Sequence, residues 1–279
     1  MTSITQALTT ALFQFAWQGA LVAAMLWWIL ALLRRRSAGL RYVVCCIAMA
    51  VSVFLPAVTA YRAYSSPRSA AADLPTLLPT EATIVPAANA KPLPWNWLEH
   101  LQSWALPIWL LGVLVCSLRL IWCGRQIAAL RRSSEAAGDS IRQIVEQLVE
   151  RLRSSRRVQV LISRMVDGPS VIGWIRPIIL VPASSLTGLS PEQLEAVLAH
   201  EVAHIRRYDD LVNMFQALVE TLLFYHPAVW WTSACIRRER ELCCDDLAVQ
   251  VTGNGIGYAR ALARLERMRL SSTAMASTQ

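Results

Sequence analysis

Three long runs of apolar residues fill the first half of the chain. Residues 11–33 carry no charged side chain, and the runs at 40–59 and 103–122 carry one arginine each. About twenty helical residues cross the roughly 30 Å hydrocarbon core of a bilayer. The first run is too long for a signal-peptide core and has no basic segment ahead of it. The pattern therefore predicts three transmembrane helices within residues 1–123, with a loop at 62–102 between the second and the third.

The pattern changes after residue 123. Residues 141–152 repeat apolar positions at helical spacing, which predicts an amphipathic helix. Three short β-rich runs follow, at 158–163, 170–175 and 177–182, separated by Gly-Pro and Arg-Pro pairs. We expect them to form a small antiparallel sheet. The sequence Ser-Pro-Glu-Gln at 190–193 has the residues of a helix N-terminus. Residues 124–279 thus read as one α+β domain.

Composition and charge support a membrane protein. The chain is 55% hydrophobic with a mean hydropathy of +0.39, which is too apolar for an ordinary soluble domain. Short loops rich in arginine stay in the cytoplasm. Arginines crowd the first loop and the residues after the third run, whereas the 62–102 loop mixes both signs of charge. We therefore expect the N-terminus outside a bacterial inner membrane, the 62–102 loop extracytoplasmic and residues 124–279 cytoplasmic.

The net charge of +8 fits this topology and an attraction to anionic membrane lipid. No direct contact with nucleic acid is expected. The seven cysteines lie in the predicted spans or on the inner side, so a disulfide framework is not expected either.

The candidate chemistry lies in the segment His-Glu-Val-Ala-His at 200–204. His200 and His204 are one helical turn apart on the same face, where both imidazoles can bind one zinc ion. Glu201 can instead accept a proton from the water that attacks a peptide bond. The alternative is two helical histidines that only pack or cap.

A catalytic zinc ion commonly has three protein ligands, so one more is needed. Glu241 and Asp245 lie four residues apart on one face of a later helix, and Glu239 faces another direction. We expect Glu241 to be the third ligand and Asp245 to hold a histidine ring through its N–H group. A solvated charged helix is the alternative. His226 and Tyr208 are candidates to stabilise the oxyanion, against a structural role for each.

The apolar segment at 211–235 separates the two halves of this site. If it crossed the membrane, His200 and Glu241 would lie about 30 Å apart, whereas metal bonds are about 2 Å long. Pro227 interrupts the segment, and Asn213, Gln216 and Glu220 form a polar stripe along it. We expect a bent, membrane-associated excursion that returns to the side on which it began.

These residues resemble the BlaR/MecR-type membrane zinc metallopeptidases, which include the β-lactam sensor-transducers. The resemblance covers nearly the whole chain and rests on three spans, GWIRPIILVPASSLTGLSPEQLEAVLAHEVAHIRRYDDLVN, FYHPAVWW and RERELCCDDLA. It implies a gluzincin-like, cytoplasm-facing zinc endopeptidase, with His200, His204 and Glu241 as zinc ligands and Glu201 as general base. It also implies an antirepressor that cleaves itself and a cytosolic transcriptional repressor of the winged-helix type after an outside signal.

One departure limits what the resemblance implies. Sensor members carry a further span and an extracytoplasmic penicillin-binding domain, but Lys91 is the only lysine here and no Ser-x-x-Lys motif is present. We therefore expect no β-lactam acylation by these residues. Two other functions stay open. One is a membrane quality-control or prenyl-protein type of zinc protease, and the other is a signalling receptor or scaffold without activity. The oligomeric state does not follow from the sequence.

Overall fold

The structure is a computed structural model that describes residues 3–65 and 96–276. Three long helices come first: α1 (Ser3–Leu32), α2 (Ala38–Ser65) and α3 (Asn96–Ser133). Each is long and apolar enough to cross a membrane, over Ile4–Leu32, Ala38–Ser65 and Trp104–Ser133. They coincide with the three predicted spans. Most of the predicted 62–102 loop, residues 66–95, lies outside the described part of the chain.

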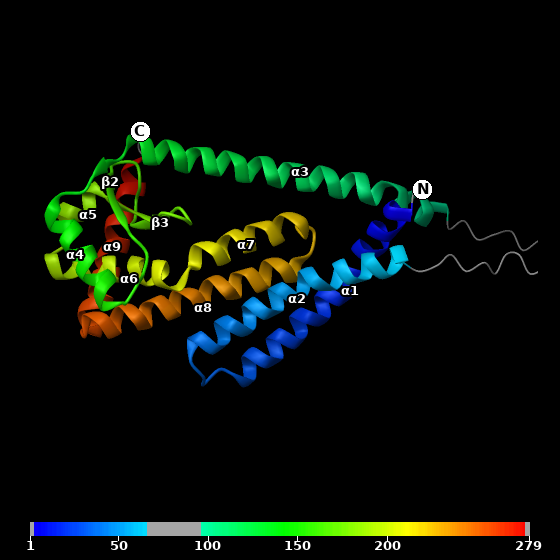
Figure 1. The fold of residues 1–279 in the computed structure, drawn as a ribbon, viewed down its shortest axis with the longest axis horizontal. Coiled ribbons are helices and arrows are strands. Elements are labelled where there is room, and N and C mark those ends of the chain that lie inside the picture. The colour runs from blue at the N-terminus through cyan, green and yellow to red at the C-terminus, as the bar shows by residue number, and fades with distance from the viewer. Residues whose placement is uncertain (1–2, 66–95, 277–279) are drawn as a thin grey trace, which may run out of the picture.

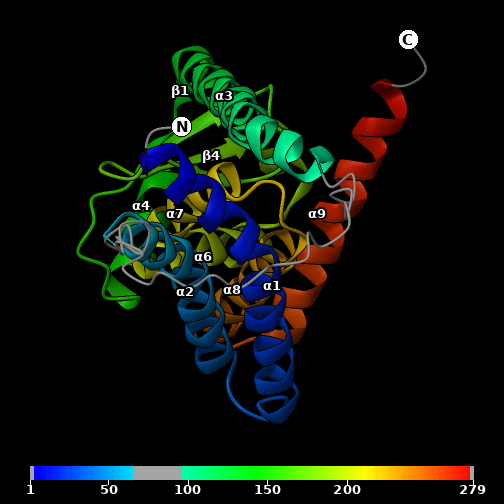
Figure 2. The ribbon, with the colours of Figure 1, turned by 90° about the vertical axis from the view of Figure 1, so that its right-hand side faces the viewer.

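The apolar segment after the histidine motif forms a helical hairpin. Helix α7 (Asp209–Leu222) is followed by α8 (Pro227–Thr252), and Pro227 occupies the first turn of α8, where a missing N–H group has no cost. The turn of the hairpin reaches the long helices: the indole of Trp109 on α3 donates to the carbonyl of Leu222 at 2.8 Å. Figures 1 and 2 show the hairpin between the α1–α2 pair and α3.

Two residues of the predicted polar stripe, Gln216 and Glu220, lie inside the hairpin, whereas the third, Asn213, is exposed. The amide of Gln216, which is 1% exposed, donates to the hydroxyl and the carbonyl of Ser233 on α8. Glu220 accepts a hydrogen bond from Ser233 and pairs with Arg237 at 2.9 Å. These two polar side chains therefore have partners between α7 and α8. Among the apolar side chains of α7, Met214 and Leu218 are exposed, whereas Val219 is buried.

The small sheet is mixed, which corrects the antiparallel prediction. Its strands are β1 (Glu135–Ala136), β2 (Gln159–Ser163), β3 (Ser170–Ile172) and β4 (Ile178–Pro182), in the order β1-β2-β4-β3. Strands β3 and β4 form an antiparallel hairpin, and β3 takes the outer edge, so β4 lies beside β2 and parallel to it. All five residues of β4 are buried. Such a continuous apolar run is typical of an interior strand with both faces covered.

Helix α6 (Pro191–Arg207) is the centre of the lobe that contains the sheet. Ser190 and Gln193 form the predicted capping box at its start. The apolar face of α4 (Asp139–Arg151) and the last helix, α9 (Gly255–Ala276), pack against it, and Leu198 and Val202 of α6 are fully buried. The short helix α5 (Ala183–Gly188) joins β4 to α6. This packing fixes the rotation of α6, and with it the direction of its two histidines.

Candidate metal centre

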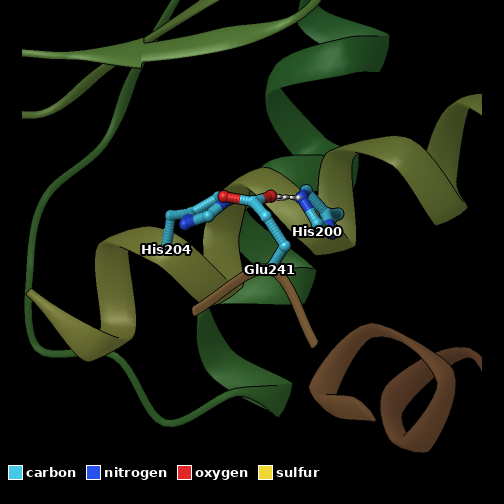
Figure 3. A group of neighbouring side chains, drawn as sticks. All are labelled: His200, His204 and Glu241. Carbon is cyan, nitrogen blue, oxygen red and sulfur yellow. Dashed lines mark hydrogen bonds and ion pairs between the residues drawn. The ribbon is translucent and has the colours of Figure 1, made fainter. Parts of the chain in front are cut away.

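His200, His204 and Glu241 meet at one point between α6 and α8. The Nε2 atoms of the two imidazoles are 3.2 Å apart. The Oε2 atom of Glu241 lies 3.4 Å from Nε2 of His200 and 3.6 Å from Nε2 of His204. Figure 3 shows the carboxylate of Glu241 across the two rings. The two histidines come from α6 and Glu241 from α8, and helix α7 lies between these two helices in the sequence.

The three atoms fit a zinc ion. Zinc bonds to nitrogen and oxygen are about 2.0–2.1 Å long, so two ligands at a tetrahedral angle lie about 3.3 Å apart. The three separations, 3.2, 3.4 and 3.6 Å, are close to this value. Two imidazoles and a carboxylate form one of the common donor sets of catalytic zinc sites, which leave a fourth position open. The geometry therefore suits this cation.

Each imidazole has a carboxylate on its other nitrogen. Nδ1 of His200 lies 3.1 Å from Asp245 and 2.9 Å from the hydroxyl of Tyr258, which itself donates to Asp245. Nδ1 of His204 lies 2.9 Å from Asp209. Such partners fix the tautomer and turn Nε2 toward the ligand position. The predicted role of Asp245 agrees with its position.

The carboxylates also set the charge preference of the site. Burial alone would lower the pKa of His200, but hydrogen bonds to Asp245 and Glu241 raise this pKa to about 10. For His204, burial is likewise outweighed by Asp209 and Glu241, and its pKa is raised to about 9. Hydrogen bonds from the two rings hold the pKa of Glu241 well below its usual range. Surroundings that favour positive charge on the rings favour a cation between them.

Glu201 lies in a cavity of about 430 Å³ beside this centre. It is 8% exposed, and burial raises the pKa of its carboxyl group. The cavity is lined by the two histidines, Glu201 and Glu241, by Pro169, Ser170 and Val171 next to and on β3, and by Asp209, Asp210, Asn213 and Arg240. A carboxylate inside a cleft with a raised pKa is suited to proton transfer near neutral pH.

The structure does not bring His226 or Tyr208 into this cavity. His226 starts α8 at the far end of the hairpin, where Nδ1 accepts from the backbone of Ala228 and Nε2 contacts the carbonyl of Ala16 on α1. Tyr208 has a left-handed backbone conformation (φ 58°) at the junction of α6 and α7, and the guanidinium of Arg156 lies 5.0 Å from its ring centre. Both residues have structural contacts instead.

The sequence did not identify two of the residues that contact the histidine rings, Asp209 and Tyr258. Asp209 contacts His204 because the left-handed turn at Tyr208 folds the chain back. It also accepts hydrogen bonds from Tyr42 of α2 at 3.2 Å and from the thiol of Cys244 at 3.3 Å. Tyr258 comes from α9, and no short-range spacing points to it. Glu239 faces away from the centre and pairs with Arg41 at 2.7 Å.

Comparisons with known proteins show which proteins this chain resembles. The regulatory protein BlaR1 of Bacillus licheniformis is 27% identical over 148 residues, which are 53% of this chain and 24% of that protein. The methicillin resistance mecR1 protein of Staphylococcus aureus is 21% identical over 141 residues, or 50% of this chain and 24% of that protein. A protease HtpX homolog of Methanopyrus kandleri is 27% identical over 128 residues, 36% of this chain and 40% of that protein.

The chain thus matches about a quarter of the length of the two regulatory relatives. The match to the family model is much more extensive. The model described as BlaR1 peptidase M56 matches residues 10–278, which include the three long helices, the sheet and the three side chains of the candidate metal centre. The chain belongs to the BlaR1 peptidase M56 family.

Proposed function

We propose that this protein is a membrane zinc endopeptidase with its active site on the cytoplasmic side. The observation that carries the proposal is the convergence of His200, His204 and Glu241 on one tetrahedral position, with Glu201 in the adjoining cavity. In this assignment the three converging side chains are the zinc ligands and Asp245 and Asp209 hold the rings. Membership in a peptidase family supports the assignment.

The residues divide the chemistry of peptide hydrolysis among them. When bound, a zinc ion supplies Lewis-acid polarisation of the peptide carbonyl and lowers the pKa of water. Glu201 accepts the proton of the attacking water, and its buried carboxyl group then gives that proton to the leaving amine. Its pKa is raised by burial, which makes it a better base than an exposed glutamate.

Strand β3 is the element best placed to hold a peptide substrate. Among the described strands it pairs with β4 alone and forms one edge of the sheet, and its first residues line the cavity beside Glu201. An extended peptide can add to such an edge through backbone hydrogen bonds. We propose that β3 binds the substrate peptide in this way. The alternative is that β3 is an ordinary strand of the sheet.

Arg240 and Asn213 replace His226 and Tyr208 as candidates to stabilise the oxyanion. Both line the cavity. Arg240 is 8% exposed; its Nη1 donates to Gln216 at 3.4 Å, and its Nε lies 3.7 Å from Oε1 of Glu241, which keeps the guanidinium beside the candidate metal ligand. A buried cationic donor next to the reacting carbonyl is suited to stabilise negative charge. We therefore propose Arg240 and Asn213, which the sequence alone did not single out, as the donors to the oxyanion.

For the biological role, we propose a signal-transducing antirepressor that cleaves itself and a cytosolic, winged-helix transcriptional repressor. The names of the two regulatory relatives support a regulatory role over a purely degradative one. The match to a protease HtpX homolog supports a second candidate function, that of a general membrane protease. The two candidates differ in their substrates: one folded repressor or many misfolded membrane proteins.

A test begins with the metal. Purified in detergent, the parent protein should contain about one zinc ion per chain, and His200→Ala, His204→Ala and Glu241→Ala should each lose it. Removal of zinc by a chelator should stop cleavage of a co-expressed repressor, and added zinc should restore it. Asp246→Asn changes an exposed carboxylate on the same helix and serves as the control. Full zinc content in any of the three ligand variants would refute this ligand set.

A further inference from the structure

A second cavity, of about 590 Å³, lies at the turn between α1 and α2. Its walls come from the last turns of α1, from the start of α2 and from the middle of α8. It has no lining residue in common with the cavity of the metal centre. The α1–α2 turn is also the point at which both long apolar helices end, below α8 in Figure 1. In a membrane this end of the helices lies at the level of the lipid headgroups.

The lining of this cavity carries an excess of positive charge. Three of its residues are Arg34, Arg41 and Arg238, and Glu239 is its one acidic residue. Glu239 is 2% exposed, and both of its oxygens are engaged, one with Arg41 at 2.7 Å and one with Arg238 at 3.2 Å. Three arginines against one glutamate leave a formal charge of +2. The ion pairs therefore do not neutralise the cavity.

The arginines present donors without full protein partners. Arg41 uses Nη1 to bind the carbonyls of Arg34 and Arg36, which fixes the turn. Arg34 is exposed, and its guanidinium has no hydrogen bond or ion pair within the described residues. Arg238 is also largely exposed and pairs with Glu239 through Nη2. Guanidinium groups in such a cluster match the geometry of a phosphate group.

The rest of the lining is apolar. Trp27 on α1 and Trp231 on α8 line the cavity and are 64% and 36% exposed. Leu30 and Leu242 also line it. Tryptophan is enriched where a membrane meets water, because its ring is amphipathic. A soluble anion would need no such surface. A cavity that joins arginines to tryptophan and leucine suits a ligand with a phosphate and a hydrocarbon chain.

We propose that this cavity binds the headgroup of an anionic phospholipid. The phosphate lies among Arg34, Arg41 and Arg238, and the upper part of an acyl chain lies against Trp27 and Trp231. The proposal rests on α1 and α2 crossing a membrane. A bound lipid connects the α1–α2 turn to α8, so it should also stabilise the packing of these helices.

The test measures lipid binding by the full chain in detergent, by native mass spectrometry with phosphatidylglycerol, phosphatidylcholine or glycerol 3-phosphate added. The Arg34→Gln/Arg238→Gln variant should bind phosphatidylglycerol about tenfold more weakly than the parent, because each arginine near a lipid phosphate contributes substantially to binding. The control is Arg35→Gln/Arg36→Gln, which removes the same charge from exposed residues outside the cavity. It should bind like the parent.

Three further results complete the test. Phosphatidylcholine should bind more weakly to the parent, glycerol 3-phosphate should not displace phosphatidylglycerol, and phosphatidylglycerol should raise the unfolding temperature of the parent more than that of the cavity variant. Arg34→Gln alone, at an exposed side chain, gives a second variant that keeps every ion pair of Glu239. Equal loss in the cavity and control variants, or displacement by glycerol 3-phosphate, would overturn the proposal.

Discussion

Some residues of the candidate metal centre could be predicted from the sequence, and others could not. The two histidines and Glu201 follow from helical spacing, and Glu241 and Asp245 follow from a second helix with the same four-residue interval. Asp209 and Tyr258 could not be assigned in this way. Asp209 reaches His204 only because the chain takes a left-handed turn at Tyr208, and Tyr258 reaches His200 only through the packing of α9 on α6.

The two carboxylates behind the rings give a prediction at this scale. Asp209→Asn and Asp245→Asn keep the size of each side chain but remove the charge that holds the imidazole. Each should weaken zinc binding about 10 to 100-fold without abolishing it. Competition with a chelator measures the affinity, and Asp246→Asn, an exposed neighbour of Asp245, should be unchanged. Parent-like affinity of Asp209→Asn would show that its contact with His204 has no effect on the metal.

Among the elements, the α7–α8 hairpin explains how distant residues form one site. The sequence indicated that this segment must return, because His200 and Glu241 need one position. Pro227, which interrupts the segment, also pointed to the turn, because α8 begins at this residue. The contacts of the turn did not follow from the sequence. The structure places His226 against α1, where the absence of a side chain at Gly19 makes room for its ring: a Cβ atom there would lie 2.8 Å from Cε1 and Nε2 of His226. How deeply the hairpin enters a membrane stays a prediction.

This contact is testable by substitution. Gly19→Ala should lower the unfolding temperature in detergent, because the ring of His226 is held by two hydrogen bonds and cannot move without breaking one. Gly124→Ala is the control, since a Cβ at this position on α3 meets nothing within 4 Å. Alanine is favoured over glycine inside a helix by about 0.5–1 kcal/mol, so the control should be slightly stabilised. An equal rise for both variants would contradict the close approach of α1 to the hairpin.

The sheet was predicted less well than the helices. Strands β2, β3 and β4 were located from short β-rich runs, but β1 was not predicted, and the relative direction of β2 and β4 was predicted wrongly. Local sequence carries turn signals, and these gave the β3–β4 hairpin correctly. The parallel pairing depends on which strand takes the edge, and this is decided by packing against α4 and α6. The uninterrupted apolar run at 178–181 was a local sign in the sequence of an interior strand.

For the whole molecule, apolar runs and arginines predict three spans and a cytoplasmic catalytic lobe. The structure contains three helices that could cross a membrane, and the orientation stays a prediction. After Gly253, a fused reporter that works only in the cytoplasm should be active, and one that works only in the periplasm should be inactive. Inserted between residues 80 and 81, the same two reporters should give the opposite result. Periplasmic activity of the first fusion would mean that the arginine distribution had been misinterpreted.

The most direct test of the central claim separates zinc binding from catalysis at Glu201. Glu201→Gln keeps the size of the side chain but cannot accept a proton, so zinc content should equal that of the parent while peptide hydrolysis falls. General acid–base catalysis contributes about 10²- to 10⁴-fold, and the loss should lie in this range. The measurement compares self-cleavage and repressor cleavage in membranes that contain equal amounts of the two proteins, with zinc determined by elemental analysis. A loss of tenfold or less at equal zinc content would contradict the assignment of Glu201 as the general base.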